Sequence, residues 1–450
     1  MNRFLIFYAA FIMQFVGLLS CSDNNDPIPE PTGNSYCLMF YASGGDPEHD
    51  LSEMSSIRQA VEATADKQNI AVTVLFKASG EKEGEAHNGV YRYIGENGVL
   101  TQDPGFVAGE DFQITDPAYL TDFIRWSAEQ CPGYKYLLAF AGHGLSFTPN
   151  LDLPLSETRA TVSDGKEIMP SYKLAQGIRE AGVPLEAMLA HSCQQGSVEM
   201  LAEWEGLADY LLGSPFSIPD YAYDYATLLT DLHEGHSMED ALVRMAKRAM
   251  NIWQVFHDSG NCGLVVEVTR LRELTRLWDV LHETFAAMRG SMNEINFTTD
   301  KPAVLGDTYG AGYQRVLQAK YEHDKDNFFE NVRANNAIDL PDFLRCAYVY
   351  SGNMQLAPYV NRLYEVLEDI LAIHLQTNGR HDFIYNVCAG PSLEKPEGMK
   401  RYQTCRFDQL TGWSDLYEAI LNVPIADGRH LSSTDQRNAI DAEVRILNNK

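Results

Sequence analysis

A histidine and a cysteine, each at the end of an apolar run, are the residues of this chain best placed to do chemistry. His143 stands between two glycines after the apolar run 137–141, and Cys193 follows the apolar run 187–190. A thiolate is a strong nucleophile, and a neighbouring imidazole can take the thiol proton and later give it to a leaving amine. The two motifs predict nucleophilic catalysis by Cys193 with His143 as general acid and base.

Backbone amides in the same motifs are expected to stabilise the negative charge that develops on an attacked carbonyl oxygen. Glycine lets other backbone approach closely and leaves its amide accessible. The amides of Gly144 and Cys193 are therefore expected to form an oxyanion hole. A helix predicted from Ser197 onward would place its positive dipole end near the thiol and favour the thiolate. Either motif alone is weak evidence, and the shared strand-end context makes the pair stronger.

These residues need a scaffold that brings two strand ends together. In the first half of the chain, short apolar runs alternate with amphipathic segments, which predicts an α/β fold with a mostly parallel sheet covered by helices on both faces. Sites in such sheets lie at the carboxyl ends of adjacent strands. Strands are expected at 36–41, 70–76, 134–141, 185–190 and 208–212, a hairpin at 88–100, helices at 51–65, 117–130, 171–180 and 197–204, and a surface loop or small hairpin at 145–169.

The second half is richer in helical patterns. A capping box at Ser237 predicts a helix start, and further helices are expected at 270–288 and 358–374. Strands are expected at 262–268 and 383–388. We divide the chain into a signal peptide (1–20), a tether (21–34), a catalytic domain (35–268) and a helix-rich C-terminal region packed on it (269–450).

The first twenty residues have the pattern of an export signal. Arg3 supplies a positive charge, and the apolar run 4–19 is too short to span a membrane comfortably. The sequence Leu-Leu-Ser-Cys ending at Cys21 matches a bacterial lipobox, in which the cysteine is acylated and becomes the new N-terminus. We expect a lipoprotein of the bacterial cell envelope, in the outer membrane, and the acidic residues after Cys21 favour surface exposure. An ordinary signal peptide with a coincidental cysteine is the alternative.

The net charge of the chain is −27, from 62 acidic and 35 basic residues. Nucleic-acid binding is excluded because it requires a basic surface. The charge suits cationic polypeptide partners, although a solvated acidic surface explains it equally well. Eight cysteines occur without a CxxC pair, so neither a zinc ribbon nor a thioredoxin-type site is indicated. The segment His233-Glu234-Gly235-His236 lacks the i, i+4 spacing of a helical zinc motif, and we expect no metal ligands there.

The motifs resemble those of the clostripain-like cysteine peptidases, which have a caspase-like fold. That family has His-Gly after an apolar strand, then Cys-x-x-Gly-x-x-Glu, then Ala-Asp-Tyr-x-x-Gly-Ser. The matching segments here are 142–144, 193–199 and 208–214, and the resemblance extends over about residues 36 to 420. It implies a peptidase that hydrolyses polypeptides and needs no cofactor, with calcium dependence left open.

One position departs from the family pattern. The family has an aspartate two residues before the nucleophile, in the pocket for basic side chains, and this chain has His191. A preference for cleavage after Arg or Lys is therefore in doubt. Asp220 and Asp224 are the acidic residues expected to supply charge to the specificity pocket instead.

Two other functions stay open at this point. A surface binding lipoprotein with the same fold and no activity is the alternative from a different class. Transfer of the acyl group to another amine, through the same acyl-enzyme, cannot be separated from hydrolysis by sequence.

Overall fold

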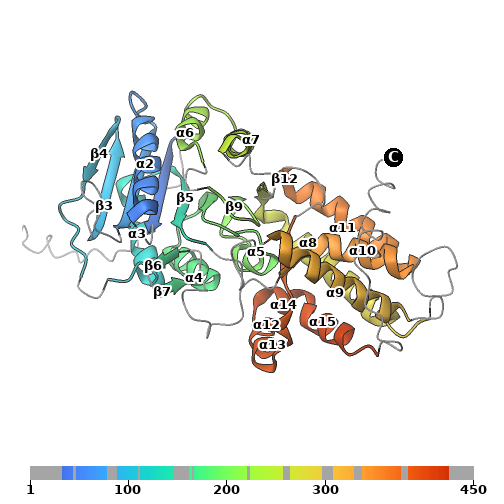
Figure 1. The fold of residues 1–450 in the computed structure, drawn as a ribbon. Coiled ribbons are helices and arrows are strands. Elements are labelled where there is room, and N and C mark those ends of the chain that lie inside the picture. The colour runs from blue at the N-terminus through green and yellow to red at the C-terminus, as the bar shows by residue number, and fades with distance from the viewer. Residues whose placement is uncertain are drawn as a thin grey trace, which may run out of the picture.

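The computed structural model describes most of the chain between residues 33 and 424 (Figure 1). The described ranges are 33–43, 47–78, 89–109, 112–144, 162–164, 167–219, 223–256, 264–295, 308–328, 337–376 and 384–424. Cys21 and the predicted signal peptide lie outside them. None of the helices in the described ranges is both long and apolar enough to cross a bilayer.

A nine-stranded sheet forms the centre of the molecule, with strand order β12-β10-β9-β8-β5-β1-β2-β3-β4. The five strands from β2 to β9 in this order are parallel, and the strands at both edges are antiparallel. The strands are β1 (Tyr36–Ser43), β2 (Ile70–Ala78), β3 (Gly89–Glu96), β4 (Val99–Gln102), β5 (Lys135–Gly142), β8 (Leu185–His191), β9 (Ala208–Gly213), β10 (Val265–Arg270) and β12 (Leu371–Gln376). The expected α/β fold with a mostly parallel sheet is confirmed.

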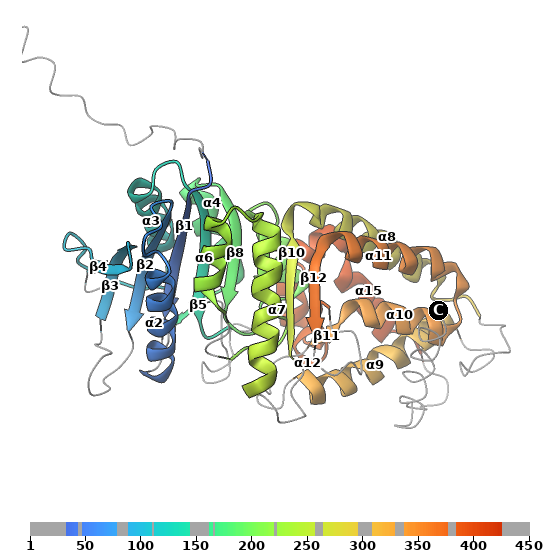
Figure 2. The same cartoon turned by 90° about the horizontal axis from the view of Figure 1, so that it is seen from above.

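Alternation along the strands gives the sheet two apolar faces. In β1, Leu38 and Phe40 belong to one core, while Met39 and Tyr41 belong to the other. Helices α2 (Pro47–Glu62), α6 (Tyr225–His233) and α7 (Met238–Phe256) cover the first face, and Figure 2 shows them side by side. Helices α3 (Pro117–Gln130), α4 (Ser171–Ala181) and α5 (Val198–Trp204) cover the second face.

Local signals in the sequence account for several element ends. The Asp116 side chain caps α3 by accepting from the amide of Ala118 (2.9 Å). Ser237 accepts from the amide of Asp240 (3.1 Å) at the start of α7, as the capping box predicted. Asn97 and Gly98 both have positive φ (50° and 76°) and form the tight turn of the β3–β4 hairpin. The stretch before α4 ends in a small hairpin, β6 (Val162–Asp164) with β7 (Glu167–Met169).

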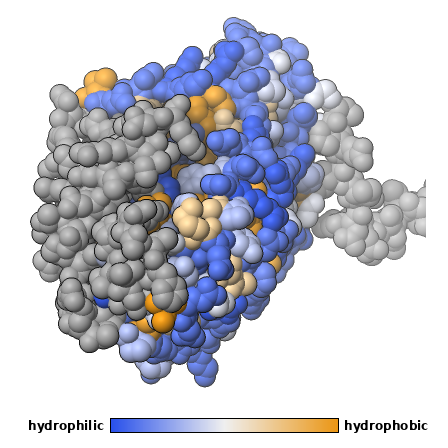
Figure 3. All heavy atoms as spheres, turned by 90° about the vertical axis from the view of Figure 1, so that its right-hand side faces the viewer, coloured by the Kyte–Doolittle hydropathy of each residue, from blue (hydrophilic) through white to orange (hydrophobic). Residues whose placement is uncertain are grey.

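The C-terminal region packs at the β10–β12 end of the sheet (Figure 1). Its elements are η1 (Leu271–Glu273), α8 (Leu274–Ser291), α9 (Tyr309–Phe328), β11 (Ala337–Asp339), α10 (Leu340–Ser351), η2 (Met354–Leu356), α11 (Ala357–Ile370), β13 (Asn386–Cys388), α12 (Pro391–Glu394), α13 (Pro396–Tyr402), α14 (Arg406–Thr411) and α15 (Trp413–Leu421). Their apolar side chains continue the core on the α3–α5 face. The described surface of this end is mainly hydrophilic with small separate apolar spots (Figure 3).

The helix expected at 358–374 is wrong in its last part. The helix α11 ends at Ile370, and Leu371–Gln376 forms strand β12, antiparallel to β10. The segment forms a strand because its backbone pairs with β10, which lies about a hundred residues earlier in the chain. A local periodicity cannot show it.

Smaller differences concern element ends. The turn of 3₁₀ helix η1 delays the helix expected from residue 270, so that α8 begins at Leu274. The late strand shortens to Asn386–Cys388. The first helix ends at Glu62, so Ala65, the last residue of the helix expected at 51–65, lies exposed in the turn after α2. The strand expected at 262–268 is β10, and Cys262 lies outside the described residues.

Candidate active site

His143 is positioned by the end of β5 and by a glycine that the backbone requires. Gly142 has φ +139°, and a Cβ there would lie 2.1 Å from the carbonyl oxygen of Ser43. Ala141, the last inward residue of β5, faces the α2–α6–α7 side of the sheet. Two residues further on, the ring of His143 packs on that of His49 in α2, with centroids 4.0 Å apart.

Cys193 occupies the matching position on the neighbouring strand. Ala141 of β5 pairs with His191 of β8, so His143 and Cys193 each stand two residues beyond the same rung of the sheet. A Cβ on Gly144 would lie 2.2 Å from the carbonyl oxygen and 2.7 Å from the amide nitrogen of Cys193. The two motifs predicted from the sequence therefore meet at the carboxyl edge of the sheet, beside the β1–β5 junction where strand order reverses.

The thiol of Cys193 is held by backbone groups. The amide of Ile218 donates to Sγ (3.4 Å), and Sγ lies 3.7 Å from the carbonyl oxygen of the same residue. Gln194 has φ +59°, a left-handed conformation that is costly for a side-chain-bearing residue, and its amide donates to the carbonyl of Phe216 (2.8 Å). The Gln195 side chain donates to the carbonyl of Cys193 (2.7 Å). Together these contacts hold residues 192–197, the nucleophile loop, in its conformation.

Cys193 differs from the other described cysteines in its exposure. Of these six, it alone is partly exposed, whereas the remaining five are buried. The buried thiols include Cys388, whose pKa is raised well above its ordinary value by desolvation. Reagents and substrates that reach a described thiol therefore reach Cys193 first.

His191 faces the α2–α6 side and is almost fully buried (2% exposed). Its Nδ1 lies 3.1 Å from the hydroxyl of Tyr225 in α6 and 3.5 Å from a carboxylate oxygen of Glu53 in α2. The carboxylate that the family pattern has on β8 is replaced here by an imidazole, and a carboxylate stands behind it on α2.

The two acidic candidates for the specificity pocket have different outcomes. Asp220 lies outside the described residues. Asp224 caps α6: its carboxylate accepts from the amide (3.0 Å) and hydroxyl (2.6 Å) of Thr227 and lies 3.3 Å from Arg248. These bonds give Asp224 a structural role at the start of α6.

The short helix α5 begins one residue later than expected. It starts at Val198, and the hydroxyl of Ser197 already caps it by accepting from the amide of Met200 (3.3 Å). The next helical residue, Glu199, is fully buried and accepts from the amide of Cys388 and the hydroxyl of Tyr402 (both 2.7 Å). Burial raises the pKa of Glu199 to about 7, although these hydrogen bonds lower it.

Potential metal ligands come together at the opposite end of α6. Ligand atoms of Asp231, Glu234 and His236 lie within 4.8 Å of one another. The sequence expectation treated this segment as a turn without ligands. Arg244 lies 3.7 Å from Asp231, and Glu234 lies 3.9 Å from His236.

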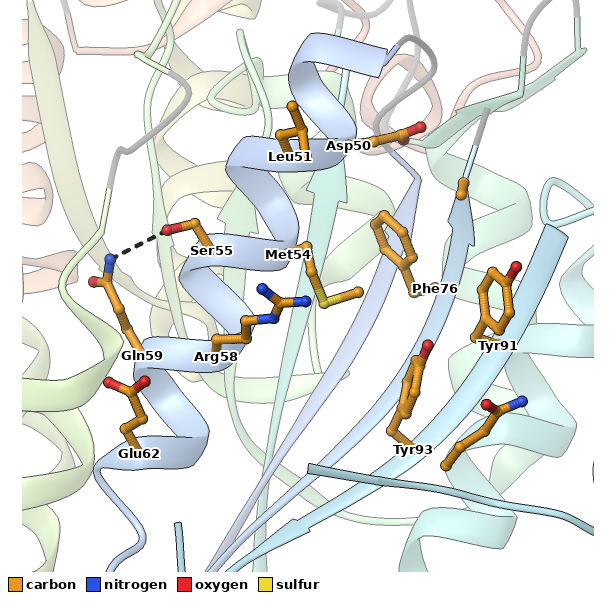
Figure 4. A pocket seen from close by; sticks show the side chains of 12 residues that line it. Asp50, Leu51, Met54, Ser55, Arg58, Gln59, Glu62, Phe76, Tyr91 and Tyr93 are labelled. Atoms are coloured by element: carbon orange, nitrogen blue, oxygen red, sulfur yellow. Dashed lines mark hydrogen bonds between the residues drawn. The ribbon is translucent and has the colours of Figure 1, made fainter. Parts of the chain in front are cut away.

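A cavity of about 550 Å³ lies between α2 and the outer strands (Figure 4). Asp50, Met54 and Arg58 of α2 face Phe76, Tyr91 and Tyr93 across it. Neither His143 nor Cys193 lines it. It belongs to the α2 face beside the candidate active site.

Sequence reasoning missed the residues that surround the dyad: His49, Glu53, Ile218, Tyr223 and Tyr225. One signal was available, because His49 and Glu53 are spaced i, i+4 in the helix that follows the first strand. The start of that helix must lie at the carboxyl edge of the sheet. Ile218 and Tyr223 lie on the connection between β9 and α6, which carries no periodic pattern, and Tyr225 is the first residue of α6.

Solved structures support the fold. A secreted C11 cysteine protease from Bacteroides thetaiotaomicron, in complex with an irreversible peptide inhibitor, matches with TM-score 0.58 and 16% identity over 85% of this chain and 99% of that chain. An inactive zymogen C11 protease from Parabacteroides distasonis matches with TM-score 0.57 and 13% identity, at the same coverage of both chains. No curated protein matches the chain.

The family comparison is more specific than the structural one. The model of the clostripain family matches residues 42–365, which is most of the chain and includes β5, β8 and the loops that follow them. The resemblance drawn from the motifs is confirmed at the level of family and fold. The chain belongs to the clostripain family of cysteine peptidases.

Proposed function

We propose that the protein is a cysteine endopeptidase in which Cys193 is the nucleophile and His143 the general acid and base. The observation that carries this proposal is the strand register. His143 and Cys193 each stand two positions beyond Ala141 and His191, which are paired in adjacent parallel strands. The packing of Gly144 on the backbone of Cys193 supports it.

The reaction uses protein groups alone. His143 takes the thiol proton, and Sγ attacks the carbonyl carbon of the scissile bond. The amides of Gly144 and Cys193 donate to the oxyanion. The C–N bond breaks as the imidazolium protonates the leaving amine. Water, deprotonated by His143, then attacks the thioester and releases the carboxylic acid and the free thiol.

An active-site probe tests the assignment. Acyloxymethyl-ketone peptides with different residues at the cleavage position should label the purified protein at Cys193, as peptide mapping by mass spectrometry would show. Cys193→Ala should abolish both labelling and peptide hydrolysis, while Cys346→Ala, which changes a buried thiol, should retain both. Turnover that survives Cys193→Ala would disprove the nucleophile.

The same experiment separates the remaining functions. A binding lipoprotein without activity would give neither labelling nor hydrolysis in the unmodified chain. Transpeptidation would give a new amide product when a peptide amine is added in excess.

We also propose that selectivity differs from the family pattern at His191. A neutral imidazole cannot form the charge-assisted bond that a carboxylate offers to Arg or Lys. Its neighbours, Glu53 and Tyr225, already bind its Nδ1 side. The protein is expected to discriminate weakly in favour of basic residues at the cleavage position.

A further inference from the structure

Tyr223 brings a buried hydroxyl close to the nucleophile. The side chain is 5% exposed, and among the described residues its hydroxyl has no hydrogen-bond partner. Its ring packs edge-on against that of His191 (centroids 5.5 Å apart) and lies 6.0 Å from that of Trp253. The neighbouring Tyr225 is different, because its hydroxyl is bonded to His191.

The hydroxyl of Tyr223 is near enough to Cys193 to interact with its charge. Burial raises the pKa of Tyr223 well above its ordinary value, and a thiolate at Cys193 raises it further. The phenol therefore stays protonated at physiological pH and can donate a hydrogen bond. A buried donor without an acceptor is unfavourable, so an acceptor is expected when the site is occupied.

The substrate is the source of that acceptor. During attack on a peptide carbonyl, the side chain of the residue being cleaved lies beside the nucleophilic sulfur. The ring of Tyr223 packs on that of His191, which precedes Cys193 by two residues and faces α2 and α6. Ile218 covers Sγ with its backbone, so a substrate enters by displacing that contact.

The surroundings favour an uncharged side chain. The ring of Tyr223 packs on those of His191 and Trp253, so the surroundings of its hydroxyl are mainly aromatic. The carboxylate of Asp224 is bonded within α6 and to Arg248, and that of Glu53 lies against His191. An amide carbonyl on a side chain of moderate length fits aromatic walls with one donor.

We propose that Tyr223 determines specificity by donating its hydroxyl to the side-chain carbonyl of a glutamine or asparagine at the cleavage position. The proposal rests on the proposed peptidase function and names its substrate class. A site built to bind such an oxygen should reject an analogue that lacks it, because the donor is then left unpaired.

Glutamine and methionine substrates test the inference, because their side chains are similar in length and only glutamine carries an acceptor oxygen. In otherwise identical peptides, the unmodified protein should cleave the glutamine peptide with a kcat/KM about tenfold to a hundredfold higher. Tyr223→Phe should bring the ratio close to one, because kcat/KM for the glutamine peptide falls while kcat/KM for the methionine peptide stays unchanged. Tyr136→Phe, which removes one buried hydroxyl at the opposite end of β5, should keep the glutamine preference within a few fold.

The outcomes distinguish this inference from the proposed function. Three outcomes would overturn the role of Tyr223 while leaving the peptidase function intact. They are equal kcat/KM for the glutamine and methionine peptides in the unmodified protein, a preference for arginine, or an equal loss of kcat/KM for both peptides in Tyr223→Phe. Absent labelling of Cys193 by every probe would overturn the function itself. The measurement on the unmodified protein decides even if Tyr223→Phe does not fold.

Discussion

Gly144 shows how one missing side chain shapes the candidate site. A Cβ at this position would collide with two backbone atoms of Cys193, and backbone cannot yield as a flexible side chain can. Gly144→Ala should therefore displace the nucleophile loop or the oxyanion amides. We expect kcat to fall by about a hundredfold or more, the size of a lost oxyanion donor, with little change in thermal stability.

Gly290→Ala is the control for that substitution. A Cβ on Gly290 in α8 has open space around it, and alanine suits a helix better than glycine. Kinetics with a fluorogenic peptide should be unchanged. A Gly144→Ala protein with full activity would show that the loop tolerates the contact and that Gly144 does not build the site.

His191→Asp should raise turnover of arginine substrates relative to neutral ones. A carboxylate facing a basic side chain supports selectivity of about tenfold to a hundredfold. Glu53 modifies this expectation, because it lies 3.5 Å from His191 and two carboxylates in one buried site do not both ionise readily. The double change His191→Asp with Glu53→Gln is expected to favour arginine more than His191→Asp alone. Competition kinetics with paired peptides would measure both, and equal ratios in both variants would exclude a role for Glu53.

The positions of His143 and Cys193 could be predicted because both residues follow apolar strands that the sequence shows plainly. Glu53 and Tyr223 could not be assigned in the same way. They reach the site from α2 and from the connection before α6, and only the packing of these elements on the sheet brings them near His191. Asp224, which the sequence suggested for the specificity pocket, caps α6 instead.

At the scale of elements, α5 connects the nucleophile loop to the C-terminal region. Glu199 on this helix holds β13 and α13 through Cys388 and Tyr402. Because burial raises its pKa to about 7 from an ordinary value of 4.5, the folded protein binds the proton more tightly than the unfolded chain. The contribution to stability is complete below about pH 4.5 and is lost as the pH rises through 7.

Glu199→Gln should abolish that loss. Glutamine stays neutral and keeps a carbonyl acceptor, so its free energy of unfolding should match the unmodified protein near pH 5 and exceed it at pH 8. The difference is expected to approach about 3 kcal/mol, from 1.36 kcal/mol per pKa unit. Urea titrations at both pH values would measure it. Glu203→Gln on the same helix is the control and should keep the original pH dependence, whereas equal slopes for Glu199→Gln would refute the linkage.

Most elements of the sheet and its covering helices were predictable because their patterns are local. The helix predicted at 358–374 was wrong from residue 371 onward, because strand 371–376 follows α11 without any break signal in the sequence. The identity of β12 as a strand depends on β10, and Glu267 of β10 even binds His374 of β12 (2.7 Å). Pairings between distant segments leave little trace in the sequence of one partner.

At the scale of the whole molecule, the C-terminal region is part of the catalytic fold. It supplies β12 to the sheet and both donors to Glu199. A chain ending at residue 268 should therefore fail to fold, because it cuts β10 before its end and leaves the buried carboxylate of Glu199 without its donors Cys388 and Tyr402. Circular dichroism and probe labelling would test this, with the whole chain carrying Cys193→Ala as a folded reference for the spectrum. Cooperative unfolding and labelling of the short chain would contradict the expectation.

The anchor is a separate expectation, carried by the sequence alone. We propose acylation of Cys21 and attachment to the bacterial outer membrane. Cys21→Ala should shift the protein from the membrane fraction to the soluble fraction, as immunoblots of fractionated cells would show. If the variant stayed with membranes after a high-salt wash, the lipobox assignment would be wrong.

The pairing of β12 with β10 also means that this edge of the sheet is completed late during synthesis of the chain. Residue 270 leaves the ribosome about a hundred residues before the segment that will pair with it. Until then β10 presents an open edge on which another chain can pair. In the export that we propose, the chain crosses the membrane from its N-terminus, so β10 is exposed again while the last strand is still arriving. Refolding yield should therefore fall steeply as protein concentration rises, and export should depend on factors that shield nascent chains.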